Sequence, residues 1–203
     1  MRKLMIAAIA VVGISATGLA QQQVKFGPKA GVNLANLSGM DDTDMKIGFH
    51  VGAVAEIKFN DKFSLQPELL YSAQGTKIDM SMDIPMIGKL EFEYKTNLDY
   101  INIPIMAKYY FVEGFSVEAG PQVSFLIKAE EKAKSDGESE TLDIKDGLNS
   151  IDFGLGFGLA YDLPQGLFIN ARYNLGLTDI VKDNNGDAVK NSVIQVGVGF
   201  KFD

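Results

Sequence analysis

Hydrophobic and polar residues alternate along most of the chain from Val24 onward. A period of two places successive side chains on opposite faces of a β-strand, whereas an amphipathic helix repeats about every 3.6 residues. The clearest segment is Ile151–Tyr161, where large apolar residues alternate with aspartate, glycine and alanine. The same alternation predicts eight strands, at residues 26–34, 47–59, 63–71, 101–109, 115–125, 151–161, 167–175 and 194–202.

The connections between the predicted strands differ in length in a regular way. Three short and four long connections place both chain termini on the side of the short turns. This asymmetry is typical of small outer-membrane barrels, whose periplasmic turns are short and whose outer loops are long. We therefore predict an all-β fold, an eight-stranded antiparallel up-and-down transmembrane β-barrel with short periplasmic turns and four long outer loops. The short turns are Asn60–Lys62, Val112–Gly114 and Pro164–Gly166, and the long connections are residues 36–46, 77–97, 128–149 and 178–191.

The two faces of the predicted strands differ in chemistry. One face carries most of the aromatic residues and no charged residue, whereas the other combines glycines with charged and amide side chains. The interior of an eight-stranded barrel is just wide enough for side chains to fill, so glycines beside long charged side chains fit the inside. We therefore expect the apolar face to contact lipid. The polar residues expected inside are Lys29, Asn33, Glu56, Lys58, Glu68, Lys108, Glu118, Gln122, Asp152, Asn170, Arg172, Asn174, Gln195 and Lys201.

Aromatic residues on the apolar face gather at two heights. Two such belts are expected where a hydrocarbon band is bordered by two membrane interfaces, so they support the assignment of this face to lipid. The belt near the short turns comprises Phe26, Phe59, Phe63, Tyr109, Phe111, Phe115, Tyr161, Phe200 and Phe202, and the belt near the long loops comprises Phe49, Tyr71, Phe125, Phe153 and Tyr173.

Beyond Gly75 the alternation reverses, because apolar residues move to even positions and charged residues to odd positions. One interpretation is a β-hairpin at about residues 77–96 that protrudes into water, with a charged outside and a small apolar inside, and closes or rims the outer mouth. The other is a β-bulge near Gly75, which would produce the reversal without protrusion. Leu142, Ile144 and Leu148 show the same reversal before the strand at 151–161.

The first twenty residues have the features of a secretory signal peptide. Arg2 and Lys3 give a positive start, an apolar stretch follows over residues 4–12, and small residues end at Ala20. An uncleaved anchor helix is the alternative, but the apolar stretch is at the short limit for spanning a bilayer. We therefore expect a cleaved signal peptide at residues 1–20, an outer-membrane β-barrel domain at residues 21–203, and a location in the cell outer membrane.

Composition narrows the possible functions. The 203 residues include 19 Lys and Arg against 26 Asp and Glu, a net charge of −7, which excludes a nucleic-acid-binding role that rests on charge alone. A hydrophobic content of 46% argues against disorder. The lack of cysteine excludes disulfide bonds, thiolate zinc sites and cysteine nucleophiles. Acids alternating with Lys132 and Lys134 over Glu130–Glu140 predict a solvated, mobile loop.

Four short motifs are spread through the chain. They are Phe26–Asn33, Leu65–Tyr71, Tyr100–Ile105 running into Lys108–Tyr110, and Arg172–Leu177. In this order and spacing they resemble the porin-family, PorT-like outer-membrane β-barrel proteins, over essentially the whole chain after residue 20. The resemblance implies an eight-stranded barrel inserted by the outer-membrane assembly machinery, and some relatives support protein secretion. One departure is that the terminal aromatic residue, Phe202, is followed by Asp203.

The acidic and basic side chains expected inside the barrel are similar in number, so we predict that they pair across the lumen. Once they fill the interior, eight strands leave no water-filled bore. A proton or ion path along the same network is the alternative. The predicted network comprises Glu56, Glu68, Glu118 and Asp152 with Lys29, Lys58, Lys108 and Arg172.

His50 is the only histidine, and its parity points it inward near the outer end. A catalytic use would need a nucleophile such as Ser72 or Ser124 and an orienting acid, and a histidine that is only hydrogen-bonded is the alternative. The acidic runs Asp41–Asp44 and Asp183–Asp187 lack the full spacing of a calcium loop. We therefore predict no catalytic residue, no metal site and no cofactor.

These expectations favour a non-enzymatic integral outer-membrane protein. The barrel would serve as an anchor or structural element, and the long loops would contact an envelope or surface protein. The expected partners are outer-membrane lipids, the outer-membrane assembly machinery and that protein, with no nucleic acid. The alternatives are an enzyme acting on envelope lipids, a narrow transport pore or secretion-accessory barrel, and a soluble calycin-like ligand barrel.

Overall fold

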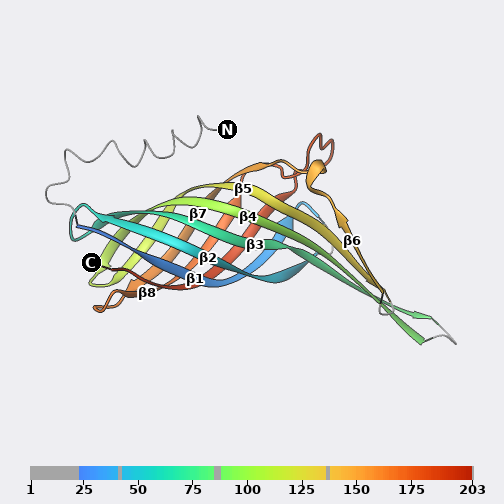
Figure 1. Cartoon of the computed structure of the whole chain (residues 1–203), viewed down its shortest axis with the longest axis horizontal. Helices are drawn as coiled ribbons and strands as arrows, with labels where there is room; N and C mark the ends of the chain where they lie inside the picture. Colours follow the sequence, from blue (N-terminus) through green and yellow to red (C-terminus); the bar gives the residue numbers. More distant parts are fainter. Residues whose placement is uncertain (1–22, 41–42, 85–87, 136–137, 203) are drawn as a thin grey trace.

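The computed structural model describes residues 23–40, 43–84, 88–135 and 138–202. Its strands form one antiparallel sheet in the order β4-β3-β2-β1-β9-β8-β7-β5-β6, and pairing of β4 with β5 closes the first eight into a barrel (Figure 1). The predicted eight-stranded ring is therefore confirmed. The elements are β1 (Gln23–Ser38), β2 (Asp44–Lys58), β3 (Phe63–Ile84), β4 (Gly88–Val112), β5 (Phe115–Ser135), β6 (Glu138–Asp143), η1 (Lys145–Gly147), β7 (Ile151–Asp162), β8 (Leu167–Gly176) and β9 (Lys190–Phe200).

One end of the barrel has only short connections. The turns β2–β3, β4–β5 and β7–β8 span residues 59–62, 113–114 and 163–166, as predicted. β1 starts and β9 ends at this same end (Figure 1). The predicted signal peptide at residues 1–20 lies outside the described residues. None of the described residues belongs to a helix long and apolar enough to cross a membrane.

Burial follows the predicted parity of the strands. Along β8 buried and exposed residues alternate from Leu167 to Gly176. On β9 the side chain of Gln195 is 1% exposed, whereas that of the adjacent Val196 is 57% exposed. Aromatic side chains of the predicted belt near the turns touch one another on the outer surface, with ring centroids 4.9 Å apart for Phe63 and Tyr109. The polar face is therefore inside and the apolar face outside.

Glycines on the inner face make room for long polar side chains. A Cβ atom at Gly31 would lie 2.6 Å from Cε1 of His50, and one at Gly197 would lie 2.9 Å from Nε2 of the same ring. The space that these two glycines leave is thus filled by the imidazole. This arrangement explains why glycine alternates with apolar residues along β9.

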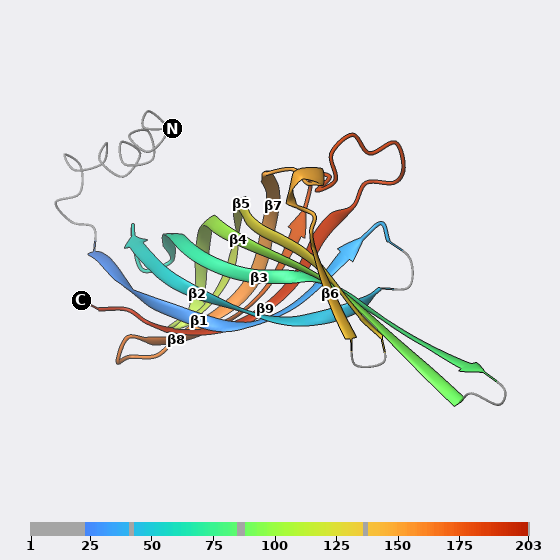
Figure 2. The ribbon, with the colours of Figure 1, turned by 45° about the vertical axis from the view of Figure 1, so that its right-hand side comes forward.

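β3, β4 and β5 continue well beyond the barrel (Figure 2). The β3–β4 register is unbroken from Leu70↔Asn102 to Ile84↔Gly88, so the predicted hairpin is confirmed. The β3–β4 pair itself contains no bulge at Gly75. The hairpin projects away from the barrel and does not lie across its mouth (Figures 1 and 2). An irregularity near Gly75 does occur on the β2–β3 pair, where the register shifts between Met45↔Thr76 and His50↔Ser72. The β4–β5 register also shifts, between Asp99 and Tyr100.

The prediction of a mobile loop at Glu130–Glu140 is wrong for its described residues. Residues 130–135 belong to β5 and pair with β6, from Glu130↔Asp143 to Ser135↔Glu138. β6 was not predicted, because a strand solvated on both faces needs no hydrophobic alternation. The extensions of β3, β4 and β5 together with β6 form a four-stranded sheet outside the barrel, which we call the outer sheet.

Candidate functional site

The middle of the lumen contains a layer of four charged side chains from four strands, which we call the central layer. Arg172 donates hydrogen bonds from Nη2 and Nη1 to the two carboxylate oxygens of Glu68, at 2.7 and 3.1 Å, and from Nε to Oε1 of Glu118 at 2.8 Å. Lys29 lies 3.1 Å from Glu68 Oε2. All four side chains are 0% exposed. Two positive and two negative charges leave the central layer neutral.

A second group of charges lies toward the short turns, and we call it the periplasmic layer. Lys201 Nζ donates to Oε2 of Glu56 at 2.5 Å and to Oδ1 of Asp162 at 2.7 Å. Lys108 Nζ lies 3.3 Å from Asp162 Oδ2 and 3.9 Å from Glu56 Oε1. The Tyr110 hydroxyl is within hydrogen-bond distance of both carboxylates, at 2.6 Å from Asp162 Oδ2, and can donate its one proton to either. This layer also contains two charges of each sign.

Gln66 connects the two layers. Its Nε2 donates to Glu68 Oε1 at 2.8 Å, and its Oε1 accepts from Lys108 Nζ at 3.3 Å. A buried ion pair is favourable only when hydrogen bonds satisfy its remaining donors and acceptors, and Gln66 supplies two of them. The charged layers therefore form one continuous network, from the middle of the lumen to the end near the short turns.

The predicted ion-pair network is confirmed for six of its eight members. The other two are corrected, because Lys58 and Asp152 form no salt bridge within the described part of the chain. Lys58 Nζ instead lies 5.0 Å from the centre of the Tyr110 ring, and Asp152 accepts hydrogen bonds from neutral groups. Four participants were missing from the predicted network, Gln66, Tyr110, Asp162 and Lys201. Lys201 was among the polar residues expected inside. The other three occupy even positions of their strands, so parity could have identified them.

His50 lies in a layer of amides on the outer side of these charges. Its Nδ1 is 2.8 Å from Asn33 Oδ1, which also accepts from Gln195 Nε2 at 3.1 Å. Ser72 accepts from Asn33 Nδ2 at 3.0 Å, and Ser124 accepts from a glutamine. The His50 side chain is 1% exposed and contacts an amide where catalysis would need an orienting acid. The structure thus places the candidate catalytic residues inside the lumen without forming a triad.

Above the amides, the outer mouth is filled by an apolar cluster that we call the cap. Its residues come from β1, β4, β5, the segment before β7 and the β8–β9 loop. Leu148 belongs to the cap and Ile144 packs against it, whereas Leu142 is 64% exposed. Two of these three residues are therefore on the inside, as their reversed alternation predicts. The cap comprises Leu37, Leu98, Tyr100, Leu126, Ala129, Leu148 and Ile180.

The acidic run Asp183–Asp187 forms an ordinary turn. Asn184 Oδ1 accepts from the Gly186 amide at 2.9 Å, and its Nδ2 donates to the Asp187 carbonyl at 2.8 Å. Among the described residues, no group of three or more His, Cys, Asp or Glu side chains is arranged to hold a metal ion. The first two residues of the other acidic run, 41 and 42, lie outside the described ranges.

The order of layers decides what the lumen can do. Two neutral charged layers, the amides and the cap fill it from the turns to the outer mouth.

The sequence profile of the outer membrane protein beta-barrel domain family matches residues 19–182. The chain belongs to this family. It is therefore an integral outer-membrane β-barrel with a lumen filled by side chains, located in the outer membrane.

Solved structures similar to this outer-membrane barrel include three small surface or membrane proteins. Neisserial surface protein A is 17% identical, with 89% of this chain and 99% of that chain covered and a TM-score of 0.49. Ail, the attachment invasion locus protein of Yersinia pestis, is 16% identical over the same shares, with a TM-score of 0.48. The N-terminal β-barrel domain of Pseudomonas aeruginosa OprF is 14% identical, over 90% and 100%, with a TM-score of 0.38. No curated protein sequence matches the chain.

Proposed function

We propose that this outer-membrane barrel is a non-enzymatic anchor that presents the outer sheet and loops to an envelope or surface protein. The observation that carries the proposal is the continuation of β3, β4 and β5 from a filled barrel into a sheet beyond it. A rigid scaffold that displays a protruding surface is a common basis for recognition. In this arrangement the barrel fixes the position of the outer sheet and the outer sheet makes the contact.

The edges of the outer sheet support this role. β3 pairs with β2 only as far as Asp44↔Lys77, and β6 pairs with β5. Strand edges with unpaired backbone groups can accept a strand from another chain. The described side chains of β6, from Ser139 to Asp143, are exposed and include two acids. Such an edge favours an extended partner segment with basic residues.

Removal of the hairpin tests the anchor proposal. Lys77 and Lys95 face each other across β3 and β4, so an Asn-Gly turn that joins them replaces the hairpin beyond this pair. In living cells, cross-linking from a tag in the β8–β9 loop should capture the partner with the full chain and lose it with the shortened chain. Both chains should keep the heat-dependent shift in gel mobility that marks a folded barrel. Equal capture by both would contradict the role of the hairpin.

The enzyme alternative depends on His50. Lipid chains outside the barrel cannot reach a side chain that is 1% exposed and enclosed by the lumen. We therefore expect His50→Ala cells to keep the lipid composition of cells with the original protein, at equal amounts of folded barrel. A change in envelope lipids with folding unaltered would favour the enzyme.

The narrow-pore alternative depends on an open path. The charged layers are neutral and their members are linked by salt bridges, and the cap closes the outer mouth with apolar side chains. We expect no discrete conductance steps when the purified protein is inserted into planar bilayers. Regular steps of one size would favour transport.

Three finer points belong to the same proposal. The order of the four sequence motifs supports a PorT-like relationship and a secretion-accessory role as the second candidate function. The positive start and small residues support cleavage after Ala20, which N-terminal sequencing of protein from outer membranes tests. The partners in the membrane would be lipids on the apolar face and the assembly machinery during insertion, with no nucleic acid.

A further inference from the structure

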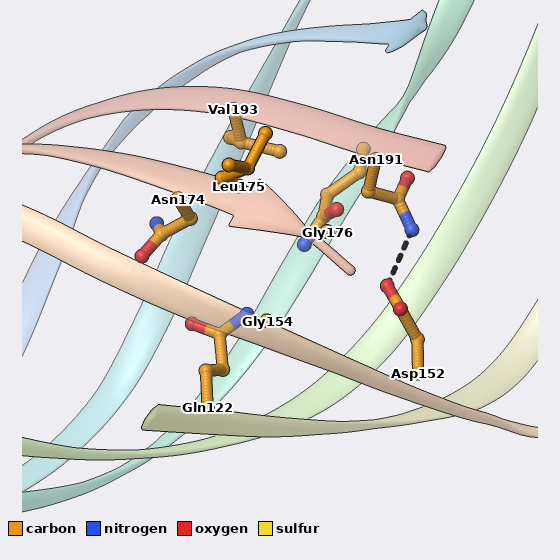
Figure 3. Close-up of a pocket in the computed structure, with 9 residues that line it drawn as sticks. Gln122, Asp152, Gly154, Asn174, Leu175, Gly176, Asn191 and Val193 are labelled. Atoms are coloured by element: carbon orange, nitrogen blue, oxygen red, sulfur yellow. Dashed lines mark hydrogen bonds between the residues drawn. The ribbon is translucent and has the colours of Figure 1, made fainter. Parts of the chain in front are cut away.

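A protein partner of this barrel has to bind outside the lumen. Figure 3 shows a small polar cavity in the outer part of the lumen, between β5, β7, β8 and β9. Gln122, Asp152 and Asn174, which line it, are each more than nine-tenths buried. The barrel wall and the cap keep another protein away from these side chains. The surfaces open to a partner are therefore the loops and the outer sheet.

β3 forms one of the two edges of the outer sheet (Figure 2). The sheet runs in the order β3-β4-β5-β6, and no described strand pairs with the free side of β3 beyond Asp44↔Lys77. The backbone groups of Ile78–Ile84 that point away from β4 are therefore left for a further strand. This length is sufficient, because strands of globular proteins average about five to six residues.

The free part of β3 alternates in chemistry. Apolar residues occupy positions 78, 80, 82 and 84, and Asp79, Ser81 and Asp83 lie between them. Ile78 pairs with Tyr94 of β4, and Tyr94 pairs with Ala133 of β5, so these three residues share one face of the sheet. Tyr94 is 44% exposed. A further strand with apolar residues on this face would extend it and reduce its contact with water.

The opposite face is acidic at the same edge. Asp79 faces Glu93 of β4, and like charges directly opposite each other are unfavourable, whereas opposite charges are favourable. The salt bridge of Asp79 to Lys77 along β3 is exposed, so water screens it. In the next row toward the barrel, β2 places Asp44 opposite Lys77. A strand that continues the line of β2 would likewise place an opposite charge, a basic residue, beside Asp79.

A second copy of the chain is disfavoured at this edge. The sequence from Ile78 to Ile84 reads the same in both directions, Ile-Asp-Met-Ser-Met-Asp-Ile. In the antiparallel register that pairs all of these residues, Asp79 of each copy would lie opposite Asp83 of the other. Two pairs of like charges then oppose the association. The edge is therefore suited to a chain with the opposite charge.

We propose that the free edge of β3 binds an extended segment of an envelope or surface protein in which apolar residues alternate with basic ones. The segment adds a strand to the outer sheet, with apolar residues beside Ile78 and a basic residue opposite Asp79. This inference rests on the proposed function and specifies the chemistry of the partner. β6 is the poorer edge for such a segment, because its described residues, Ser139–Asp143, include a single apolar one.

A palindromic peptide tests the proposal on the full barrel in detergent micelles. Val-Lys-Val-Thr-Val-Lys-Val, with a fluorescent label, has the required alternation in either strand direction. We expect its fluorescence anisotropy to rise on binding to the barrel. Val-Glu-Val-Thr-Val-Glu-Val has the same apolar content and should not bind. Equal binding of both peptides would indicate adsorption to detergent or to any apolar surface and would overturn the proposal.

Charge reversals on the two edges identify which edge the basic peptide occupies. Asp79→Lys should weaken its binding at least about threefold, because attraction is replaced by repulsion. Glu140→Lys is the matched control, since Glu140 is an exposed acid on β6, and it should leave binding unchanged. Loss of binding in Glu140→Lys alone would place the peptide on β6 and overturn the proposal. A dimer of the original chain that dissociates in Asp79→Lys would also overturn it, because a second copy would then occupy the edge.

Backbone pairing can be separated from attraction between charges. An added strand uses the N–H groups of every second residue, so N-methylation of one alternate set in the peptide should abolish binding and N-methylation of the other should not. Equal binding of the two methylated peptides would exclude strand addition. If no peptide binds but removal of the hairpin still abolishes cross-linking in cells, this inference is wrong and the anchor proposal stands.

Discussion

Arg172 is the residue whose loss should damage the barrel most. It contacts two buried carboxylates, Glu68 and Glu118, and its side chain is 0% exposed. Arg172→Met would leave the central layer with one positive charge and two negative ones. We expect the free energy of unfolding to fall by about 3–5 kcal/mol, the usual effect of breaking a buried ion pair from one side. Urea unfolding of the barrel in lipid vesicles measures it.

An exposed lysine on the same barrel supplies the control for this prediction. Lys128 forms a salt bridge to Glu130 at 2.9 Å, but its side chain is 54% exposed. Water and salt screen such a pair, so Lys128→Met should leave the unfolding curve unchanged. Equal losses in both variants would indicate that the lumenal charges do not hold the barrel together.

Asp179 should make the β8–β9 loop sensitive to acid. Its Oδ1 accepts hydrogen bonds from the backbone amides of Val181 and Val189, at 3.0 and 3.1 Å. The amide of Val181 first, and also Asn184 and the amide of Val189, hold the pKa of Asp179 below its ordinary value of 3.8. A lowered folded-state pKa means that the stabilisation is complete above pH 3.8 and disappears as the pH falls through the lowered value.

Hydrogen exchange at the two amides measures the effect. Protection of Val181 and Val189 should decrease as the pH falls below 3.8, after correction for the intrinsic exchange rate. Asp179→Asn keeps an oxygen that can accept both hydrogen bonds but does not titrate in this range, so its protection should not change with pH. Protection that falls in the same way in both chains would rule out Asp179 as the titrating group.

At the scale of elements, the sequence reveals a strand only where the two faces have different surroundings. β9 was predicted because apolar residues such as Val196 alternate with polar residues such as Gln195. In the structure Val196 faces outward and Gln195 faces inward. β6 was missed because the described residues Ser139–Asp143 are exposed on both faces. The alternation of apolar residues reports a difference in environment, and a strand with water on each side has none. The pairing of β5 with β6 therefore cannot be predicted from the sequence pattern and is seen only in the structure.

The same limit applies to the cavity and the charged layers. Parity places Arg172 and Glu68 on the inner face. It does not predict which carboxylate pairs with which basic side chain. Their contact joins residues 104 positions apart and depends on the stagger of strands around the barrel. Asp152 shows the consequence, because it is on the predicted face yet lies outside the ion network. Sequence thus predicts which residues enter the lumen, and the stagger decides their partners.

The two faces of β9 can be compared by adjacent substitutions. A Cβ at Gly197 would lie within 3 Å of Asn170 Oδ1 and of His50 Nε2, so Gly197→Leu should force the lumen to rearrange. We expect a loss of about 1–3 kcal/mol in the free energy of unfolding, as for other overpacked cores. Val196→Leu adds a methylene on the exposed face and should have little effect. Equal effects at both positions would contradict the filled lumen.

At the scale of the whole molecule, one experiment tests which surfaces of the protein face lipid and which face water. Val196 and Leu155 face outward on the barrel, whereas Thr141 on β6 belongs to the outer sheet. Spin labels at Val196 and Leu155 should be relaxed by oxygen, which dissolves in acyl chains, and a label at Thr141 by a water-soluble nickel complex. The expected contrast arises because the barrel lies in the bilayer and the outer sheet lies beyond it. If the Val196 label meets the nickel complex, the apolar face is not in lipid. If the Thr141 label meets only oxygen, the outer sheet lies in the membrane and cannot be the surface that a partner contacts.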